Sequence, residues 1–549
     1  MTDKFTQHAH LHILIFIAAL ANLSALFIPI LEPDGATYAA IAKNMVLNNN
    51  YWELFSMQRD WLDKPHFPFW ITALSFNLFG FENWAYKFPG ILFIFIGAWY
   101  TYRFAYERYN NKTIGLWAAL FLLSAQHILM SNNDVRAEPY LTGLIIASFY
   151  HFYKAHAKHS FWHLVAGALF AGCAIMTKGM FALFPIAGAL AGHFILSRQW
   201  KALLHWRWLL AAILIFIFIL PELYSLYIQF DAHPEKIVFG TKNVSGIRFF
   251  FWDSQFGRFF NTGPIKGKGD PFFFVHTTLW AFLPWSVMLY AGLANLIRWR
   301  GRPRQEWYTF AGAMITFLLF SASSFQLPHY INIVFPFFAV ITAAYIFYIE
   351  TPGARRFLTI TQWVQIILIL IAIPLLHFFV LKPENPSVIG IIYTLILIAG
   401  IFVYPRLLRG APKNQLIAAS VFAVLAINVY INLIMYPELM KYQSGMNAAE
   451  YVNKHYPGRQ VLQTRQFVSY PFDFYSNERV QYIDSIADLD KAKYAGALLF
   501  VPVRALEGPV PDSLPRFNHF GISRLTGKFL YHETREAQSE PYVLMPVEP

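Results

Sequence analysis

Long apolar segments alternate with short polar connections along most of this chain. A helix that crosses about 30 Å of hydrocarbon needs roughly 20 mostly apolar residues. The pattern therefore predicts an all-α polytopic membrane protein with about thirteen transmembrane helices. We place them at residues 11–30, 86–103, 113–130, 139–154, 161–176, 180–197, 208–227, 271–297, 307–323, 330–349, 358–381, 387–404 and 414–436.

Basic residues mark one side of this array. Short loops rich in Lys and Arg stay in the cytoplasm. The pattern predicts a cytoplasmic N-terminus and an extracytoplasmic C-terminus, with the first apolar run kept as a span and not cleaved as a signal peptide. The basic residues lie in alternate connections: Arg103, Arg108 and Lys112; Lys154 and Lys158; Arg198, Lys201 and Arg207; Arg298, Arg300, Arg302 and Arg304; Arg355 and Arg356; Arg406, Arg409 and Lys413.

The predicted outer side carries the long connections. Residues 31–85 and 228–270 form two outer loops, each rich in aromatic and charged residues. Within the first loop, residues 66–80 are apolar but too short for a confident span, which favours a helix lying in the membrane interface. We expect these loops to belong to a transmembrane domain that covers residues 1–440.

The last part of the chain, residues 441–549, has a different pattern. Its hydropathy falls, a helical periodicity covers 445–456, and strand-like runs (VLQT, AGALLFVPV and PYVLMPV) stand beside turn residues. This pattern predicts a small soluble α/β domain on the outer, extracytoplasmic face.

Composition excludes several other classes of protein. Of 549 residues, 56% are hydrophobic and only 13% are charged, whereas a soluble chain carries roughly a quarter charged residues. The chain is therefore neither a soluble enzyme nor a disordered protein. The single cysteine, Cys173, excludes an intrachain disulfide framework. The net charge of +12 follows the predicted topology, so we expect no nucleic-acid partner.

Charged and polar residues recur at the outer ends of the early spans. A charge at the membrane boundary costs a few kcal/mol unless it is paired, solvated or bound to a ligand. Each residue also fits a structural role alone, such as a helix cap, a local ion pair or part of the aromatic belt. Their confinement to one side favours a site for a phosphate-bearing substrate. The candidates are Asp34, Asp63, Lys64, Arg136, Glu138, Lys178, Arg258, His329 and Tyr330.

The order of short motifs resembles the GT-C glycosyltransferases of family 39. This PMT-like group includes the lipid A aminoarabinose transferases and the dolichyl-phosphate-mannose protein mannosyltransferases. The resemblance covers about residues 10–350. The motifs are Pro33-Asp34-Gly35-Ala36-Thr37-Tyr38, Asp63-Lys64-Pro65-His66-Phe67-Pro68-Phe69-Trp70, Trp84-Ala85-Tyr86-Lys87-Phe88-Pro89, Arg136-Ala137-Glu138-Pro139-Tyr140-Leu141-Thr142, Thr177-Lys178-Gly179, Gln255-Phe256-Gly257-Arg258-Phe259, Leu283-Pro284-Trp285-Ser286 and Leu327-Pro328-His329-Tyr330.

The chain also departs from the pattern of that family. The family usually has an acidic pair after the first span, where this chain has Asp34-Gly35, and an Arg-x-Asp motif, where it has Arg136 and Glu138. A lysine common before Leu-Pro-x-Tyr is replaced by Gln326. These departures make the sugar and the acceptor less certain than the reaction class.

The resemblance implies a reaction and roles for the candidate residues. The reaction is transfer of a sugar from a polyprenyl-phosphate carrier to a lipid acceptor, such as lipid A, or to a protein, on the outer face of a bacterial inner membrane. Asp34 would be the catalytic base, and Glu138 would hold or orient the acceptor. The residues that would bind substrate are Lys64, Arg136, Lys178, Arg258, His329 and Tyr330.

Two alternatives stay open at this stage. Some relatives hold a divalent metal ion near the carboxylate that matches Asp63, and His276 or His66 could join Asp63 as a ligand, although the chemistry does not evidently require a cofactor. The other alternative is a transporter or flippase that moves a lipid-linked or amphiphilic substrate. A transporter usually shows coupling charges at the bilayer midplane and inverted repeats, and neither is visible here.

Overall fold

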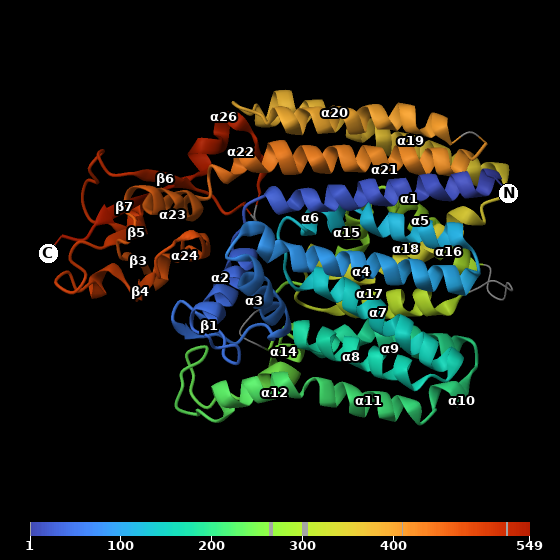
Figure 1. Ribbon diagram of the computed structural model, residues 1–549, viewed down its shortest axis with the longest axis horizontal. Helices are drawn as coiled ribbons and strands as arrows, with labels where there is room; N and C mark the ends of the chain where they lie inside the picture. Colours follow the sequence, from blue (N-terminus) through green and yellow to red (C-terminus); the bar gives the residue numbers. More distant parts are fainter. Residues whose placement is uncertain (1, 263–266, 299–305, 409, 523–524, 549) are drawn as a thin grey trace.

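The computed structural model describes residues 2–262, 267–298, 306–408, 410–522 and 525–548, and the side chains from residue 7 onward except that of Arg258. Long helices lie side by side and run between two ends of the molecule (Figure 1). One end carries a five-stranded sheet and the C-terminus; we name it the sheet end. Helix α1 begins at the other end, which we name the opposite end.

The long helices follow most of the apolar segments of the sequence. They are α1 (Thr2–Leu23), α4 (Asn83–Tyr109), α5 (Lys112–Leu123), α7 (Ala137–Lys158), α8 (Phe161–Lys178), α9 (Leu183–Leu196), α11 (Arg207–Phe218), α16 (Ser286–Arg298), α17 (Trp307–Ala322), α18 (Phe335–Phe347), α19 (Pro352–Leu375), α20 (Val388–Val403) and α21 (Pro412–Tyr430). Among the described residues, seven helical stretches are long and apolar enough to cross a membrane, and shorter apolar helices accompany them. The chain is a multi-pass membrane protein.

Three predicted spans are interrupted. The segment 208–227 is divided into α11 and the short helix α12 (Leu220–Leu226). The segment 271–297 is not one helix but two, α15 (Phe273–Ala281) and α16, and Pro284 stands between them. Proline lacks an N–H donor and disfavours helical geometry in the residue before it. Likewise, the segment 113–130 ends as α5 and resumes as the short helix α6 (Gln126–Ser131).

Short elements cover the sheet end between the long helices. The expected helix within 66–80 is α3 (Phe67–Phe79). The other short elements are η1 (Ser24–Phe27), α2 (Asp34–Leu47), β1 (Phe55–Ser56), β2 (Arg59–Asp60), η2 (Met180–Ala182), α12 (Leu220–Leu226), η3 (Tyr227–Asp231), α13 (Gly246–Arg248), η4 (Phe249–Asp253), α14 (Phe256–Phe259), η5 (Pro328–Val334), η6 (Leu376–Leu381), η8 (Ile431–Met435) and α22 (Tyr436–Met440). At the opposite end lie α10 (Trp200–Leu203) and η7 (Tyr404–Leu407).

Residues 441–549 contain the five-stranded sheet, in the order β4-β3-β5-β7-β6. Strands β4, β3 and β5 are parallel, and β7 is antiparallel to both of its neighbours. The three strand-like runs of the sequence are β3, β5 and β7, and the helical periodicity is α23. The bounds are α23 (Ser444–His455), β3 (Val461–Thr464), α24 (Tyr470–Tyr475), β4 (Gln481–Ile483), β5 (Leu498–Pro502), β6 (Arg516–His519), α25 (Gly527–Leu530), α26 (His532–Arg535) and β7 (Glu540–Pro546).

Lys43 of α2 ties this C-terminal region to the helices. Its side chain is buried, and its Nζ donates to the carbonyl oxygens of Asp473, Phe474 and Ser476 at 3.1, 2.9 and 2.7 Å. These carbonyls belong to the end of α24 and the residues that follow it. A buried ammonium needs such partners, because its loss of hydration is otherwise costly. The same helix α2 begins at Asp34, so the contact positions a candidate site residue.

Candidate functional site

Arg136 joins two carboxylates from different segments of the chain. It precedes α7, and its Nη1 lies 2.7 Å from Oδ2 of Asp34 at the start of α2. Its Nε and Nη2 donate to Oδ2 of Asp134 at 2.7 and 2.5 Å. Burial disfavours the charge of Arg136, but the carboxylates of Asp134 and Asp34 outweigh burial and hold the pKa of the guanidinium above its usual range. Arg136 therefore stays charged and holds the start of α2 against the start of α7.

The second acid of this cluster comes from an unexpected position. A Cβ atom added to Gly35 would lie 2.6 Å from Oδ1 of Asp134. The space beside Asp34 is therefore filled by a carboxylate from residue 134, where the sequence pattern of the resembling family has two adjacent acids. Burial raises the pKa of Asp134, and the charge of Arg136 opposes that rise.

Three further candidates, Lys178, His329 and Tyr330, lie close to Glu138. Its side chain is only 3% exposed, and its Oε1 forms an ion pair with Nζ of Lys178 at the end of α8. Nε2 of His329 lies 3.8 Å from the same oxygen. The Lys178 Nζ also lies 3.6 Å from the ring centroid of Tyr330, within the range of a cation–π contact. Helices α7, α8 and η5 thus meet at one carboxylate.

Gly179 explains why a glycine follows Lys178. Its φ of +92° is a backbone conformation that other residues rarely adopt. A Cβ atom there would lie 2.3 Å from Nε2 of Gln255, and that nitrogen donates to the carbonyl oxygen of Lys178 at 3.1 Å. The glycine lets the 249–260 segment pack directly on the end of α8, which places Lys178.

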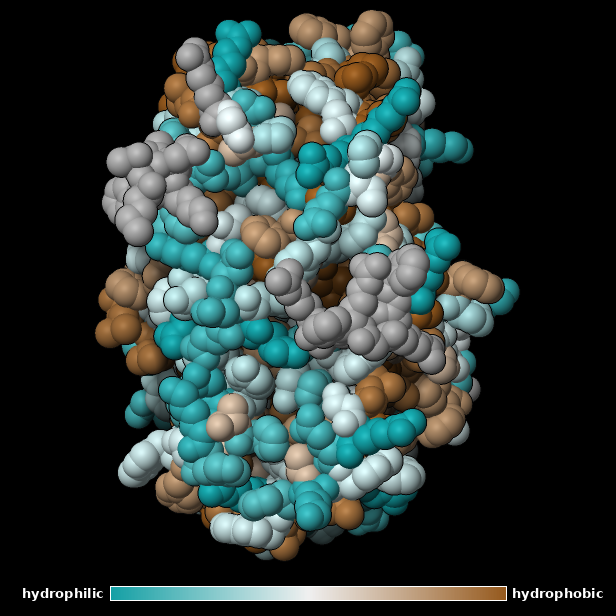
Figure 2. Space-filling view, turned by 90° about the vertical axis from the view of Figure 1, so that its right-hand side faces the viewer, coloured by the Kyte–Doolittle hydropathy of each residue, from teal (hydrophilic) through white to brown (hydrophobic). Residues whose placement is uncertain are grey.

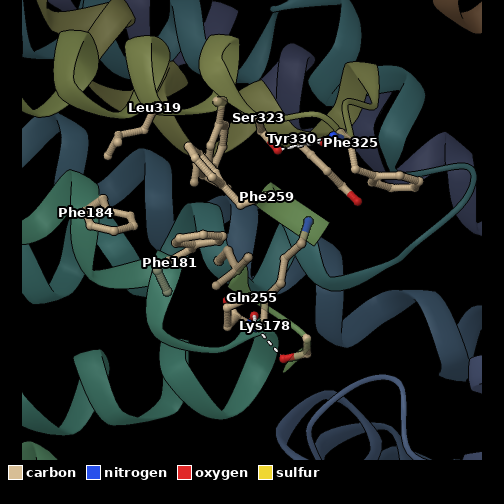
Figure 3. Close-up of a pocket in the computed structure, with 14 residues that line it drawn as sticks. Lys178, Phe181, Phe184, Gln255, Phe259, Leu319, Ser323, Phe325 and Tyr330 are labelled. Atoms are coloured by element: carbon tan, nitrogen blue, oxygen red, sulfur yellow. Dashed lines mark hydrogen bonds between the residues drawn. The ribbon is translucent and has the colours of Figure 1, made fainter. Parts of the chain in front are cut away.

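A narrow cavity opens beside Lys178 and Tyr330 (Figure 3). Its volume is about 70 Å³, and its walls are mostly aromatic and aliphatic side chains from α9, α14 and α17, including Phe184, Phe259 and Leu319. A site with an apolar wall and a cation at one end suits an amphiphile with a charged head.

Asp63 and Lys64 lie near the same cluster but pair with each other. Nζ of Lys64 is 2.5 Å from Oδ2 of Asp63. The buried phenol of Tyr38 links the groups electrostatically. Burial raises the pKa of Tyr38, and the negative charges of Asp34, Asp63 and Glu138 act in the same direction. The charges of these three carboxylates therefore all act on one buried phenol.

The remaining candidates lie elsewhere or outside the described part of the chain. The side chain of Arg258 is not among the described side chains. His276 is exposed, and its Nε2 lies 3.7 Å from Oδ2 of Asp270. Among the described residues, no group of three or more His, Cys, Asp or Glu side chains is placed to hold a metal ion. The suggested pair of Asp63 and His276 therefore gains no third protein ligand here, and we derive no step through a metal.

Three residues of the site were not selected from the sequence. Gln255 begins one of the quoted motifs and Asp134 stands two residues before another, so their neighbourhood was a signal, but their roles depend on packing between distant segments. His127 carried no sequence signal at all. It is buried on α6, and its Nδ1 lies 2.8 Å from Oδ1 of Asn332, which follows Tyr330 in η5.

Comparisons with known proteins show which sequences this chain resembles. A family model described as dolichyl-phosphate-mannose-protein mannosyltransferase matches residues 63–224. An undecaprenyl phosphate-α-4-amino-4-deoxy-L-arabinose arabinosyl transferase of Erwinia tasmaniensis is 25% identical over 357 residues, which are 64% of this chain and 62% of the relative. An uncharacterised protein of Aquifex aeolicus is 26% identical over 62% of this chain and 65% of its own length. The chain therefore matches somewhat less than two thirds of these relatives.

Solved structures extend the likeness to most of the fold. The crystal structure of ArnT from Cupriavidus metallidurans bound to undecaprenyl phosphate superposes with a TM-score of 0.72 at 17% identity, over 90% of this chain and 93% of ArnT. The structure of the same protein in the apo state gives a TM-score of 0.69. The resemblance drawn from the sequence is confirmed: the chain has the GT-C fold of these proteins and is similar to the PMT-like glycosyltransferases of family 39.

Proposed function

We propose that this chain transfers a sugar from a polyprenyl-phosphate carrier to a lipid acceptor at the sheet end of the molecule. The observation that carries the proposal is the convergence of Asp34, Arg136, Glu138, Lys178 and Tyr330 beside an apolar cavity. The relatives named as undecaprenyl phosphate-α-4-amino-4-deoxy-L-arabinose arabinosyl transferases support the reaction class and the polyprenyl-phosphate donor.

The cations would act on the leaving phosphate. Breaking a glycosyl-phosphate bond leaves negative charge on the phosphate, and fixed positive groups stabilise that charge in the transition state. Lys178 lies at the mouth of the apolar cavity, so it is the residue placed to hold a phosphate whose isoprenoid chain lies along the aromatic wall. Lys178 already has Glu138 as a partner, so the phosphate would share the ammonium with that carboxylate.

Asp34 would act on the acceptor. Its side chain is 45% exposed, so an incoming hydroxyl can reach it. Oδ2 forms an ion pair with Nη1 of Arg136, and Oδ1 has no hydrogen-bond partner among the described residues. A carboxylate within hydrogen-bond reach of the attacking hydroxyl can take its proton. Glu138 is buried and ion-paired, which suits positioning of Lys178 better than proton transfer.

The remaining expectations complete the proposal. We propose about thirteen spans over residues 1–440, with the N-terminus in the bacterial cytoplasm and the sheet end outside the inner membrane. Residues 441–549 would form the extracytoplasmic domain. The basic connections at the opposite end support this orientation, because Lys112, Arg355 and Lys413 all lie there.

The test uses the purified full chain in lipid vesicles with polyprenyl-phosphate donors labelled in the sugar. We expect label to move to a lipid A-like acceptor while free polyprenyl phosphate appears in equal amount. Asp34→Asn should lose this activity. Glu235→Gln should keep it. Glu235 is an exposed carboxylate in the loop 228–270, and among the described residues it pairs only with His233.

The competing function is movement of a lipid-linked substrate without chemistry. In that case labelled donor would cross the vesicle membrane with its sugar-phosphate bond intact, and no free polyprenyl phosphate would form. That result, together with normal movement by Asp34→Asn, would contradict the transferase proposal.

A further inference from the structure

A second, larger cavity lies at the opposite end of the molecule. Its volume is about 600 Å³, within the range of small-molecule sites in proteins. It is bounded by the starts of α1, α5 and α21, the end of α18 and the first turns of α19. Figure 2 shows this end face-on, with hydrophilic side chains over most of it and hydrophobic ones gathered toward its edges.

Cations line this cavity without matching acids. Lys112, Arg355 and Lys413 come from three different helices, and no carboxylate is among the described lining residues. Lys413 donates to the carbonyl oxygens of Phe347 and Ile349, both at 2.8 Å, so it is held in place by backbone. Lys112 and Arg355 have no ion pair among the described residues. Basic residues in short loops ordinarily only indicate which side of the membrane is cytoplasmic. Here three of them line the same cavity.

Asn414 adds a buried donor to these charges. It is only 4% exposed and lines the cavity. Its Oδ1 accepts from Nε1 of Trp117 at 3.0 Å, and its Nδ2 donates to no described residue. The helix α21 begins two residues earlier at Pro412 without a side-chain cap, so its first N–H groups and its positive dipole end also face this region. The Nδ2 of Asn414 is therefore a hydrogen-bond donor that a ligand in the cavity can reach.

The walls show which kind of anion fits. Trp117, Leu358 and Leu416 contribute apolar surface beside the cations. Helix α19 forms one side, and Phe357 and Ile360 on that helix are exposed large hydrophobic residues, as expected of a lipid-facing surface. A soluble anion would not need this apolar wall, whereas a phospholipid presents a phosphate above an acyl chain.

We propose that this cavity binds the phosphate headgroup of an anionic membrane phospholipid. Lys112 and Arg355 contact the phosphate, Asn414 donates to one of its oxygens, and the acyl chains leave along α19. The site lies at the other membrane face from the candidate transferase site and is independent of that activity.

The test is binding of phosphatidylglycerol to the purified full chain, measured by native mass spectrometry and by its effect on Tm in neutral detergent. We expect saturable binding that phosphatidylcholine does not reproduce. The double variant Lys112→Gln/Arg355→Gln should weaken binding by about 30-fold, because each cation near a lipid surface contributes substantially to affinity. Arg356→Gln is the matched control, since Arg356 is exposed, adjacent and not part of the lining.

A second variant tests the donor separately. Asn414→Asp keeps an oxygen for Trp117 but replaces Nδ2 with another acceptor, so it should weaken lipid binding with an unchanged Tm in the absence of lipid. Equal weakening by Arg356→Gln would overturn the proposal in favour of nonspecific surface charge. Inorganic phosphate at millimolar concentration that binds and displaces the lipid would show a soluble anion site instead and would also overturn it.

Discussion

The two cavities of this protein, one at each end, differ in how the cations beside them are paired. At the sheet end, Arg136 is paired with Asp34 and Asp134, and Lys178 is paired with Glu138 beside a cavity of about 70 Å³. At the opposite end, Lys112, Arg355 and Lys413 line a cavity of about 600 Å³, and no carboxylate is among its described lining residues. A ligand phosphate at the sheet end must share each cation with a carboxylate, so binding there rearranges the catalytic groups. The opposite end is already complementary to an anion, which suits static binding.

The largest expected effect is on the rate of sugar transfer and concerns Asp34, whose side chain is half-exposed. Asp34→Asn should lower the rate of sugar transfer by about 10²–10⁴-fold, the usual contribution of a general base. Its folding should change little, because Asp134 still pairs with Arg136. Transfer rate and Tm measured together check this, and a normal rate in Asp34→Asn would remove Asp34 from the mechanism.

Glu138→Gln should have the largest effect on stability. It leaves the charge of Lys178 without its carboxylate in a mostly buried place, and removal of one partner of a buried pair costs about 3 kcal/mol or more. The double variant Glu138→Gln/Lys178→Gln should recover much of the lost Tm. Both variants should fail in transfer. If the double variant were less stable than Glu138→Gln alone, the pair would not be the source of the loss.

Gly179→Ala tests the packing that places Lys178. The positive φ of Gly179 and the close approach of Gln255 should together cost about 1–3 kcal/mol. Gly353→Ala is the control, because a Cβ atom on Gly353 meets nothing within 4 Å and alanine favours the helix α19. Thermal melts of both variants in one detergent measure the difference, and equal losses would contradict the packing explanation.

The smallest expected effect is on the pH dependence of Tm and concerns Glu32. No Lys or Arg pairs with this carboxyl among the described residues. Burial raises its pKa to about 7, and its Oε1 lies 3.3 Å from Nδ1 of His519. Below pH 4.5 the group is protonated in both states. As pH rises to about 7 the unfolded state ionises first, so the native state loses stability. The Tm advantage of Glu32→Gln over the unmodified chain should therefore grow between pH 4.5 and 7 and then stay constant; a flat difference would contradict the pKa shift.

Apolar periodicity predicted the fold well because a membrane imposes its thickness on the sequence. It was wrong for 271–297. The average hydropathy of this segment predicts one span, but Pro284 stands between two separate helices. In the C-terminal region the strands β4 and β6 escaped notice. Strand β6 alternates between exposed and half-buried residues, and β4 is only three residues long, so neither has a strong apolar signal.

The sequence could predict which residues gather at the candidate site, but it could not predict which of them form ion pairs with each other. The structure places Asp34 beside Arg136, and it gathers Lys178, His329 and Tyr330 around Glu138. That these residues form the site stays a prediction. The partner of each charge depends on which helices pack against each other. Asp134 shows this limit: it fills the space beside Gly35, which residue spacing cannot reveal.

The contact between Lys43 and the end of α24 has a consequence for biosynthesis. A chain emerges from the ribosome with its N-terminus first, yet the three carbonyls that receive Lys43 belong to residues 473–476. The contact that ties α2 to the C-terminal region therefore forms only after nearly the whole chain has been made. A prematurely terminated product would keep the ion pair of Asp34 with Arg136 but would lack this second attachment, so the full anchoring of the helix that begins at Asp34 depends on completed translation.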